Sequence, residues 1–299
     1  MHNLYFNHLE ETFEIADRIT VIRDGKKIST YAASEITEQK LINDMVGRDV
    51  SSFYHRQDAE QGDVMLEVDG LCGNGVRDIS FSLRSGEILG FAGMVGAGRT
   101  EMAELLFGVK PKTNGTVKIK GVTVDIRQPK DAIRNKMCFI TENRQRTGLF
   151  LKHTILQNIV ISNYRKRRGI LARPSVDKKV ADDYIERLNV VTSSRLKKVV
   201  ELSGGNQQKV VLAKWFATDA DIFLFDEPTK GIDIGAKEEI YKLMTSLIQQ
   251  GKCIVLISSD MPELIAMSDR ICVMRNGTIT ARLQENEVSE QSILKCAIG

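Results

Sequence analysis

The sequence predicts an α/β fold with a mixed sheet core, and two stretches carry this prediction. Ile222–Phe225 is an unbroken apolar run of strand length, typical of a parallel strand buried on both faces, and Asp226 and Glu227 follow at its carboxyl end. Glu87–Ala92 is a similar run that leads through a glycine-rich loop into a helical pattern. Because open α/β sheets bind ligands at the carboxyl ends of their strands, we expect a binding site there.

Length and composition bound the possible classes. A chain of 299 residues could hold one large α/β domain or two smaller ones. The net charge of +3 is too small to indicate nucleic-acid binding, and the basic cluster Arg165–Arg168 is either a solvated face or a contact with a membrane surface or acidic partner. Five cysteines without a CxxC pair favour a reducing cytosol. No apolar stretch approaches the roughly 20 residues that cross a bilayer, so we expect any membrane association to be peripheral.

The two ends of the chain carry an internal repeat. Leu9–Gly25 aligns with Met261–Gly277, and the two segments share glutamate, aspartate, arginine, valine and glycine positions. Both copies predict a helix, a strand, a tight turn and a helix. The turn sequences, Asp24-Gly25 and Asn276-Gly277, favour the type I′ conformation of a β-hairpin.

If the repeat unit is a whole domain, the chain has three parts. Residues 1–48 are then the tail of a truncated first copy, whose phosphate loop would lie upstream of this sequence. Residues 49–63 are polar and lack periodicity, which is typical of a linker. Residues 64–299 are a complete second copy. The sequence does not determine whether residues 1–48 fold without the rest of their domain.

An antiparallel β subdomain is expected at the start of the second copy. Val64–Leu71 and Arg77–Leu83 have the composition of antiparallel strands, and Gly115–Val124 predicts a β-hairpin. A helical subdomain is expected to begin within Leu149–Ser175, and Asp177–Leu188 has helical periodicity.

Gly93–Thr100 has the spacing G-x-x-x-x-G-[K/R]-T of a phosphate-binding loop between a strand and a helix. Its glycines allow successive backbone N–H groups to point at a phosphate, and the Thr100 hydroxyl can reach Mg²⁺. Arg99 stands where the motif has lysine, and a planar guanidinium does not replace a compact ammonium. Two alternatives to a productive site stay open: a glycine turn without a ligand, and a loop that binds nucleotide poorly or non-productively. The predicted nucleotide-binding residues are Gly93, Gly96, Ala97, Gly98, Arg99, Thr100 and Glu101.

Two further buried strands and one helix are expected around this loop. Met137–Thr141 predicts a strand with Glu142 at its end, and Cys253–Ile257 predicts another that leads into Ser258-Ser259. Ala236–Gln249 predicts a helix before the second of these strands. The histidines form no cluster with metal-ligand spacing.

A second phosphate-binding device precedes the central apolar run. Ser203-Gly204-Gly205 opens a helical pattern, which places a hydroxyl and free backbone N–H groups at the positive end of a helix. After Ile222–Phe225, Asp226 can hold Mg²⁺ and Glu227 can orient or deprotonate an attacking water. Each motif alone is weak, because many strands that enter a polar loop end in acidic residues, whereas the order of the motifs is informative.

The motifs in this order resemble the ATP-binding-cassette (ABC) family. Leu202–Lys209 (LSGGNQQK) resembles its signature, and Phe223–Asp233 (FLFDEPTKGID) resembles its Walker B strand and D-loop. GMVGAGRTE, LSGGNQQK, DEPTKGIDIGAK and ISSDMPEL together are similar to the second half of the tandem ATPase subunits of ribose, galactose/methylgalactoside and xylose importers. The resemblance covers nearly the whole chain. It implies a P-loop NTPase ABC nucleotide-binding domain with a mixed sheet core, an antiparallel β subdomain and a helical signature subdomain.

The resemblance also implies a role for each motif. ABC domains pair head to tail, so that each ATP is held between the Walker motifs of one domain and the signature of the other. The implied roles are Glu227 as the catalytic residue, Thr100 and Asp226 as ligands of Mg²⁺, Glu142 at the Q-loop position, Asp233 in the D-loop, Ser259 at the switch position, and Leu202, Ser203, Gly204, Gly205, Asn206 and Gln207 as the signature.

This sequence departs from the family pattern on one face. Arg99, Glu142 and Ser259 stand where lysine, glutamine and histidine are expected, and Leu71–Gly75 lacks the aromatic residue that often stacks on adenine. Removing one preorganised electrostatic group typically costs about 10² to 10³ in rate, so we expect slow or absent turnover at this face. The signature is intact and is expected to complete the ATP site of a competent ABC domain.

The implied function is that of the ATP-binding and ATPase component of a sugar importer. It would use ATP and Mg²⁺, dock on transmembrane permease subunits at the cytoplasmic face of the membrane, and depend indirectly on a periplasmic or lipid-anchored sugar-binding protein. A non-catalytic partner module, a truncated product, a soluble tandem ABC protein acting on ribosomes and a small-molecule P-loop kinase are the alternatives. Residues 49–63 are short and nearly balanced in charge, which disfavours the ribosomal alternative and nucleic acid as a partner, and a signature has no role in a kinase. The sequence does not identify the sugar.

Overall fold

The computed structural model describes residues 13, 15–23, 26–37, 40, 41, 44, 56–163 and 174–298. These residues belong to two compact units, 1–55 and 56–299, and the boundary falls within the predicted linker. The turn Asp24-Gly25 and the basic cluster Arg165–Arg168 lie outside the described residues. Within the residues that are described, no helix combines the length and the apolar character needed to cross a membrane.

The first unit is built on an antiparallel hairpin. Strand β1 (Arg18–Arg23) pairs with β2 (Lys26–Ala32), and the 3-10 turn η1 (Ala33–Glu35) follows. Alternation along β1 places Ile19 and Val21 on one face, where they form a buried apolar cluster with Ile36 and Leu41. The hairpin therefore packs on a small core of its own unit.

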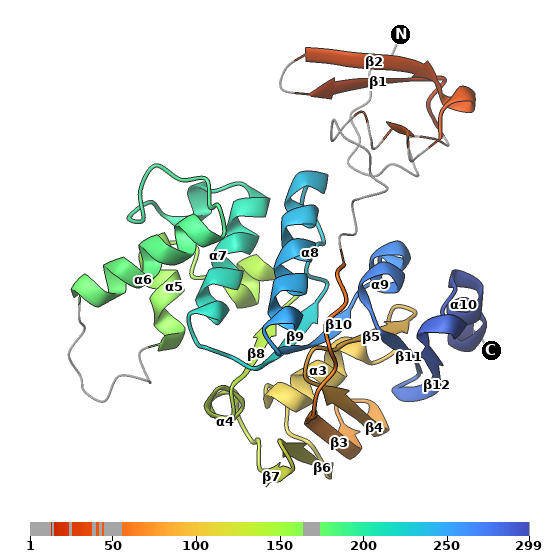
Figure 1. The fold of residues 1–299 in the computed structure, drawn as a ribbon, viewed down its shortest axis with the longest axis vertical. Coiled ribbons are helices and arrows are strands. Elements are labelled where there is room, and N and C mark those ends of the chain that lie inside the picture. Colours follow the sequence, from red (N-terminus) through yellow and green to blue (C-terminus); the bar gives the residue numbers. More distant parts are fainter. Residues whose placement is uncertain are drawn as a thin grey trace. The chain divides into compact units, whose positions relative to one another are not determined.

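The described part of the second unit contains a six-stranded sheet (Figure 1). Its strand order is β12 (Thr278–Gln284), β11 (Arg270–Arg275), β5 (Ile88–Gly93), β10 (Cys253–Ile257), β9 (Ile222–Asp226) and β8 (Met137–Ile140). All pairs are parallel except β11 with β12 at one edge. Strands β8, β9 and β10 are buried at every position, as expected of parallel strands covered on both faces. The mixed sheet core predicted from the sequence is confirmed.

Helices pack on the six-stranded sheet. Helix α3 (Arg99–Phe107) contacts β5, β8 and β9 and also β4 of a second sheet, so it lies between the two sheets. Helices α8 (Ile234–Gln249), α9 (Met261–Met267) and α10 (Glu290–Ile298) contact β10, β5 and β11, respectively, and α4 (Pro129–Arg134) contacts β8.

The predicted antiparallel subdomain is a four-stranded sheet within residues 56–163. Its order is β4 (Val76–Arg84), β3 (Val64–Gly73), β6 (Asn114–Ile119) and β7 (Val122–Val124). The rings of Phe81 on β4 and Phe91 on β5 meet edge to face with centroids 5.1 Å apart. The antiparallel sheet is thus packed directly against the central strand that precedes the glycine loop.

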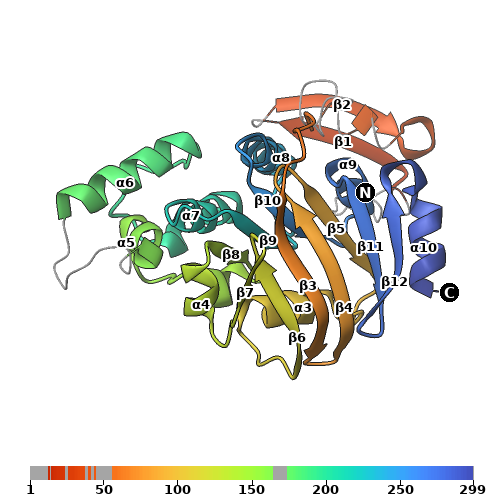
Figure 2. The same cartoon turned by 60° about the horizontal axis from the view of Figure 1, so that its bottom comes forward.

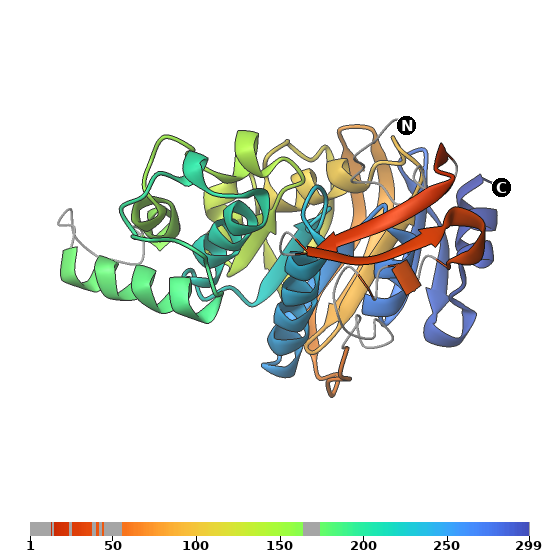
Figure 3. The same cartoon turned by 90° about the horizontal axis from the view of Figure 1, so that it is seen from above.

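The helical region lies at one end of the second unit, and β12 with α10 lies at the other (Figures 2 and 3). The helical region contains η3 (Arg144–Gly148), α5 (Ile155–Val160), η4 (Ile161–Asn163), α6 (Pro174–Arg187), η5 (Val199–Glu201) and α7 (Gly204–Phe216). The buried Lys214 of α7 donates to the carbonyl oxygen of Gly148 at 2.6 Å. Helix α7 is therefore bonded to the segment that follows β8.

The internal repeat is visible as two hairpins of the same construction, one in each unit. Strands β1 and β2 correspond to β11 and β12 in length and pairing, and each pair has an irregularity at the equivalent place, after Val21 and after Val273. Asn276 and Gly277 have φ angles of 49° and 78°, which is the left-handed geometry of the predicted turn. The sequence prediction omitted the second strand of each hairpin and the short turns η1 and η6 (Glu285–Glu287) that follow.

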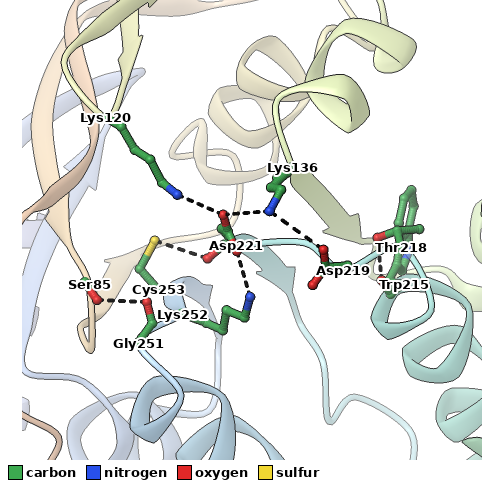
Figure 4. Close-up of polar contacts among 10 residues, drawn as sticks. All are labelled: Ser85, Lys120, Lys136, Trp215, Thr218, Asp219, Asp221, Gly251, Lys252 and Cys253. Carbon is green, nitrogen blue, oxygen red and sulfur yellow. Dashed lines mark hydrogen bonds and ion pairs between the residues drawn. The ribbon is translucent and has the colours of Figure 1, made fainter. Parts of the chain in front are cut away.

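A cluster of ions joins the two sheets of the second unit at the amino ends of the strands (Figure 4). Asp221, just before β9, pairs with Lys120 at 3.1 Å, with Lys252 at 2.7 Å and with Lys136 at 3.6 Å. Burial alone raises the pKa of this carboxyl, but the hydrogen bonds from Lys252 and Lys120 lower it below its ordinary value. Asp221 therefore links the β6–β7 turn to the starts of β8 and β10.

Candidate functional site

The predicted phosphate loop lies between β5 and α3. Gly93 has a φ of 154°, and a Cβ there would lie 2.5 Å from the carbonyl oxygen of Met274, so glycine is required. Gly98 has a φ of 100° and caps α3, while a Cβ at Gly96 would meet open space. The loop is supported from behind, because the N–H of Gly277 donates to the carbonyl oxygen of Ala97 at 2.9 Å. This is a glycine cradle in front of a helix N-terminus, which suits a phosphate group.

Arg99 and Thr100 leave this loop in different directions. A terminal nitrogen of Arg99 donates to the carbonyl oxygen of Ser258 at 2.9 Å, so its guanidinium is bonded to the segment after β10. The Thr100 hydroxyl donates to Asp226 at 3.2 Å. Glu101 lies in the first turn of α3.

Asp226 is the deepest acidic group of the site, with an exposed fraction of 1%. Burial raises the pKa of this carboxyl to about 7, and the neighbouring charges of Glu227 and Glu142 act in the same direction. A buried carboxylate beside a threonine hydroxyl is an oxygen donor pair that suits Mg²⁺, because a divalent cation would stabilise the ionised form. The residues present therefore fit this ion. Within the part of the chain that the structure describes, no group of three or more His, Cys, Asp or Glu side chains could hold a metal.

Glu227 follows Asp226 in a strained conformation. Its φ of 50° lies in the left-handed region, and its N–H still donates to the carbonyl oxygen of Ile257 at 2.9 Å. Its carboxylate accepts a hydrogen bond from the Ser259 hydroxyl at 2.9 Å. Strained residues of this kind cluster at functional sites. Such a carboxylate beside a hydroxyl can orient a water molecule.

Glu142, after β8, is paired with a residue that the sequence predictions did not include. Its carboxylate lies 2.7 Å from the ammonium of Lys230, in the turn that follows Glu227. The sequence carried a signal for this residue, since a basic side chain stands four positions after Asp226 in DEPTKGID. The structure thus brings Arg99, Thr100, Asp226, Glu227, Ser259, Glu142 and Lys230 to one edge of the sheet.

The signature segment is at the start of α7. Ser203 is the N-cap, and its hydroxyl accepts from the side-chain amide of Asn206 at 2.9 Å. The side-chain oxygen of Asn206 accepts in turn from the N–H of Val191 at 2.7 Å. Leu202 is buried, and a Cβ at Gly205 would lie 3.1 Å from Ala236. The backbone N–H groups of the first turn remain directed along the helix axis, as in other anion-binding helix starts.

Gln207 and Asp233 have structural contacts. The side chain of Gln207 is buried, donates to the carbonyl oxygens of Val199 and Leu202, and accepts from Gln145 at 3.0 Å. Asp233 caps α8 by accepting from the N–H of Ala236 at 2.9 Å. These contacts fix the position of α7 and of the start of α8.

Comparison with known proteins agrees with this geometry. Residues 76–230 match the ABC transporter family. The chain is 47% identical over 298 residues to the ribose import ATP-binding protein RbsA 3 of Rubrobacter xylanophilus, a match that covers 99% of this chain and 60% of that protein. It is 44% identical over 302 residues to the ribose import ATP-binding protein RbsA of Lacticaseibacillus paracasei, again over 99% and 60% of the two chains. The chain therefore spans 60% of the length of these relatives.

Solved structures show the same fold. An ATP-binding cassette of an ABC transporter in its ADP conformation has a TM-score of 0.67 at 20% identity, over 80% of this chain and 100% of that chain. A dimeric ATP-binding cassette bound to ADP and phosphate has a TM-score of 0.64 at 21% identity, over 74% and 99% of the two chains. The predicted fold, a P-loop NTPase domain of the ABC type, is confirmed. From the match to more than half of its residues, the chain belongs to the ABC transporter family.

Proposed function

We propose that the chain is the ATP-binding component of an ABC importer for a sugar, and that it uses ATP with Mg²⁺. It would act at the cytoplasmic face of the membrane with transmembrane permease subunits and, indirectly, with a periplasmic or lipid-anchored sugar-binding protein. The similarity to two ribose import ATP-binding proteins supports the substrate class. The matching hairpins support the proposal that residues 1–48 end a first copy of the domain and that residues 64–299 are a second copy.

In this proposal the signature face of the chain completes an ATP site whose Walker motifs belong to another ABC domain. Ser203 caps α7, and the N–H groups that follow it are suited to the phosphate groups of ATP. Gly204 and Gly205 have no side chains of their own, which allows close packing: a Cβ at Gly204 would lie 2.6 Å from the guanidinium of Arg144, a cation that also suits phosphate.

The Walker face of the chain itself is proposed to bind ATP weakly and to turn it over slowly or not at all. The observation that carries this is the bond of Arg99 to the carbonyl oxygen of Ser258, at 2.9 Å, which directs its charge toward the end of β10. Thr100 and Asp226 would hold Mg²⁺, which supplies neutralising charge to the phosphates when it is bound. Glu227 would orient the attacking water, assisted by Ser259 in place of a histidine.

The proposal is tested by the ATPase activity of the full chain, alone and mixed with an ABC domain whose phosphate loop carries lysine. We expect negligible hydrolysis by the chain alone and Mg²⁺-dependent hydrolysis in the mixture. A mixture that contains the Glu227→Gln variant should hydrolyse ATP as fast as a mixture that contains the wild-type chain. A robust rate for the chain alone that Glu227→Gln abolishes would show that this Walker face is a working active site. No gain in the mixture would argue against donation of the signature.

A further inference from the structure

The turn after β9 presents a lysine to the acidic groups of the candidate site. Lys230 lies three residues after Glu227, and its N–H donates to the carbonyl oxygen of Glu227 at 3.2 Å. Its ammonium lies 2.7 Å from a carboxylate oxygen of Glu142, which comes from a different strand end. The hydrogen bond to Glu142 raises the pKa of Lys230, and the charges of Glu227 and Asp226 add to this effect. The lysine is therefore paired with Glu142 and stands in the turn that follows Asp226 and Glu227.

The backbone under Lys230 is held by a second basic residue. The guanidinium of Arg144 donates to the carbonyl oxygens of Lys230 and Gly231 at 3.1 and 3.2 Å. Arg144 begins η3, a π-helical turn that follows β8. Because Arg144 binds two successive carbonyl groups, it holds the backbone of the turn in place. The side chain of Lys230 therefore extends toward Glu142 from a backbone that is hydrogen-bonded on its other side.

The other cations near these acidic groups are engaged elsewhere. Arg99, whose charge acts on Asp226, donates to the carbonyl oxygen of Ser258, and Arg144 donates to backbone carbonyl groups. Among the described residues, Lys230 is the cation that makes an ion pair with an acidic group of the site. A divalent cation that approached Asp226 and Thr100 would meet this positive charge, and it would find Glu142 already paired.

We propose that Lys230 is a built-in counter-cation of Glu142 at the edge of the candidate site, and that it lowers the affinity of this site for a divalent metal ion. The ammonium neutralises the carboxylate of Glu142 in the absence of metal, so a bound Mg²⁺ must act against this positive charge and compete with it for Glu142. This inference rests on the proposed nucleotide site. It adds a reason, independent of Arg99, for weak Mg²⁺-ATP binding at this face.

The test uses Mn²⁺ as the probe, because its binding to the full chain is measured directly by electron paramagnetic resonance without nucleotide or partner. Lys230→Met removes the charge and frees Glu142, and we expect it to bind Mn²⁺ about tenfold more tightly than the wild type does. Lys230→Arg keeps the charge and should retain the wild-type affinity. Lys230→Met combined with Glu142→Gln should lose most of the gain. Lys230 has a 59% exposed side chain, so these variants are expected to fold.

Lys118 provides the matched control. It pairs with Glu67 at 3.5 Å on the antiparallel sheet, and the two side chains are 44% and 42% exposed, close to the 59% and 45% of Lys230 and Glu142. Lys118→Met should leave the Mn²⁺ affinity unchanged. Equal affinities of the wild type and Lys230→Met, including no binding by either, would overturn the inference. An equal gain in Lys118→Met would also overturn it. The outcome is separate from that of the ATPase mixture, which tests signature donation and involves no change at Lys230.

Discussion

The signature face and the Walker face of the second unit are built in different ways. The signature is one continuous segment, 202–207, whose Ser203 and Asn206 satisfy each other within a single helical turn. The Walker face is assembled from the ends of β5, β8, β9 and β10, and its side chains meet across long stretches of sequence. A local device keeps its geometry when other segments change, whereas an assembled site depends on every contributor.

The two faces also differ in how well their polar groups and backbone are stabilised without a ligand. At the signature, the N-cap of α7 has its hydrogen bonds, and no acidic side chain lies in the first turn of the helix. At the Walker face, Asp226 is buried with a raised pKa and Glu227 has a left-handed backbone. A face with buried acidic groups and backbone strain is stabilised by a cation, and the chain supplies Lys230 and Arg99 in that neighbourhood.

The largest expected effect contrasts the two faces directly. In the mixture with a lysine-bearing ABC domain, Ser203→Glu should lower the ATPase rate by about 10² to 10³, because its carboxylate would repel phosphate at the helix start. Glu227→Gln should change the rate by less than about twofold. Steady-state phosphate release measures both variants. Similar losses for both would mean that both faces take part in turnover.

The next largest expected effect is a pH dependence of the unfolding free energy, which arises from Glu263 on the side of the Walker face. Glu263 is buried, which raises its pKa to about 7, and its carboxylate accepts from Ser258 at 2.7 Å and from Thr229 at 2.9 Å. The folded state therefore retains the proton that the unfolded state releases from about pH 4.5, so wild-type stability falls as the pH rises toward 7. Glu263→Gln should remove this term. Between about pH 4.5 and pH 8, the unfolding free energy of the wild type should fall by about 3 kcal/mol relative to the variant in urea titrations.

Equal pH profiles for the wild type and Glu263→Gln would show that this carboxyl group does not titrate in the folded state in this range. Ser203→Ala serves as the control on the signature side, because a hydroxyl cap does not titrate here. The difference in unfolding free energy between Ser203→Ala and the wild type should be the same at about pH 4.5 and at pH 8.

A tenfold effect is expected from restoring the lysine of the phosphate loop. Arg99→Lys exchanges a planar group bonded to Ser258 for a compact ammonium that can turn toward phosphate. The affinity of the full chain for ATP with Mg²⁺, measured by calorimetry, should rise by about tenfold. Arg99→Ala should not raise it. An unchanged affinity in Arg99→Lys would place the weakness of this face elsewhere, with Lys230 as the first candidate.

The smallest effect is the loss of the helix cap. Ser203→Ala should lower the unfolding free energy of the second unit by about 1 kcal/mol, as is typical for an N-cap serine. A loss of this size, together with a large loss of mixture ATPase in Ser203→Glu, would separate the structural role of the residue from its proposed role toward phosphate. No measurable loss would mean that Asn206 and neighbouring water replace the cap.

The sequence predicted those parts of the molecule whose signals are local. Strand β9, helix α7, the glycine loop and the turn at Asn276-Gly277 each have a continuous pattern, and each is found where it was expected. The repeat also predicted strand β11 and the turn that follows it, whose Gly277 supports the loop from behind. These features depend on composition and spacing along one stretch of chain.

The contacts that define the Walker face were not predictable in this way. The bonds from Arg99 to Ser258 and from Lys230 to Glu142 join residues that are far apart in sequence, and periodicity carries no information about which side chains meet. The inward orientation of Gln207 depends on Gln145 and on two backbone carbonyl groups in the same way. The roles of the individual site residues stay predictions.

The most direct test of the difference between the two faces is a calorimetric titration of the full chain with ATP and Mg²⁺. The account predicts no saturable binding tighter than about 1 mM for the chain alone, because Arg99 and Lys230 both disfavour a productive Mg²⁺-ATP complex at the Walker face. Micromolar binding that Thr100→Ala and Asp226→Asn abolish would contradict the account, since this face would then hold nucleotide in its own right.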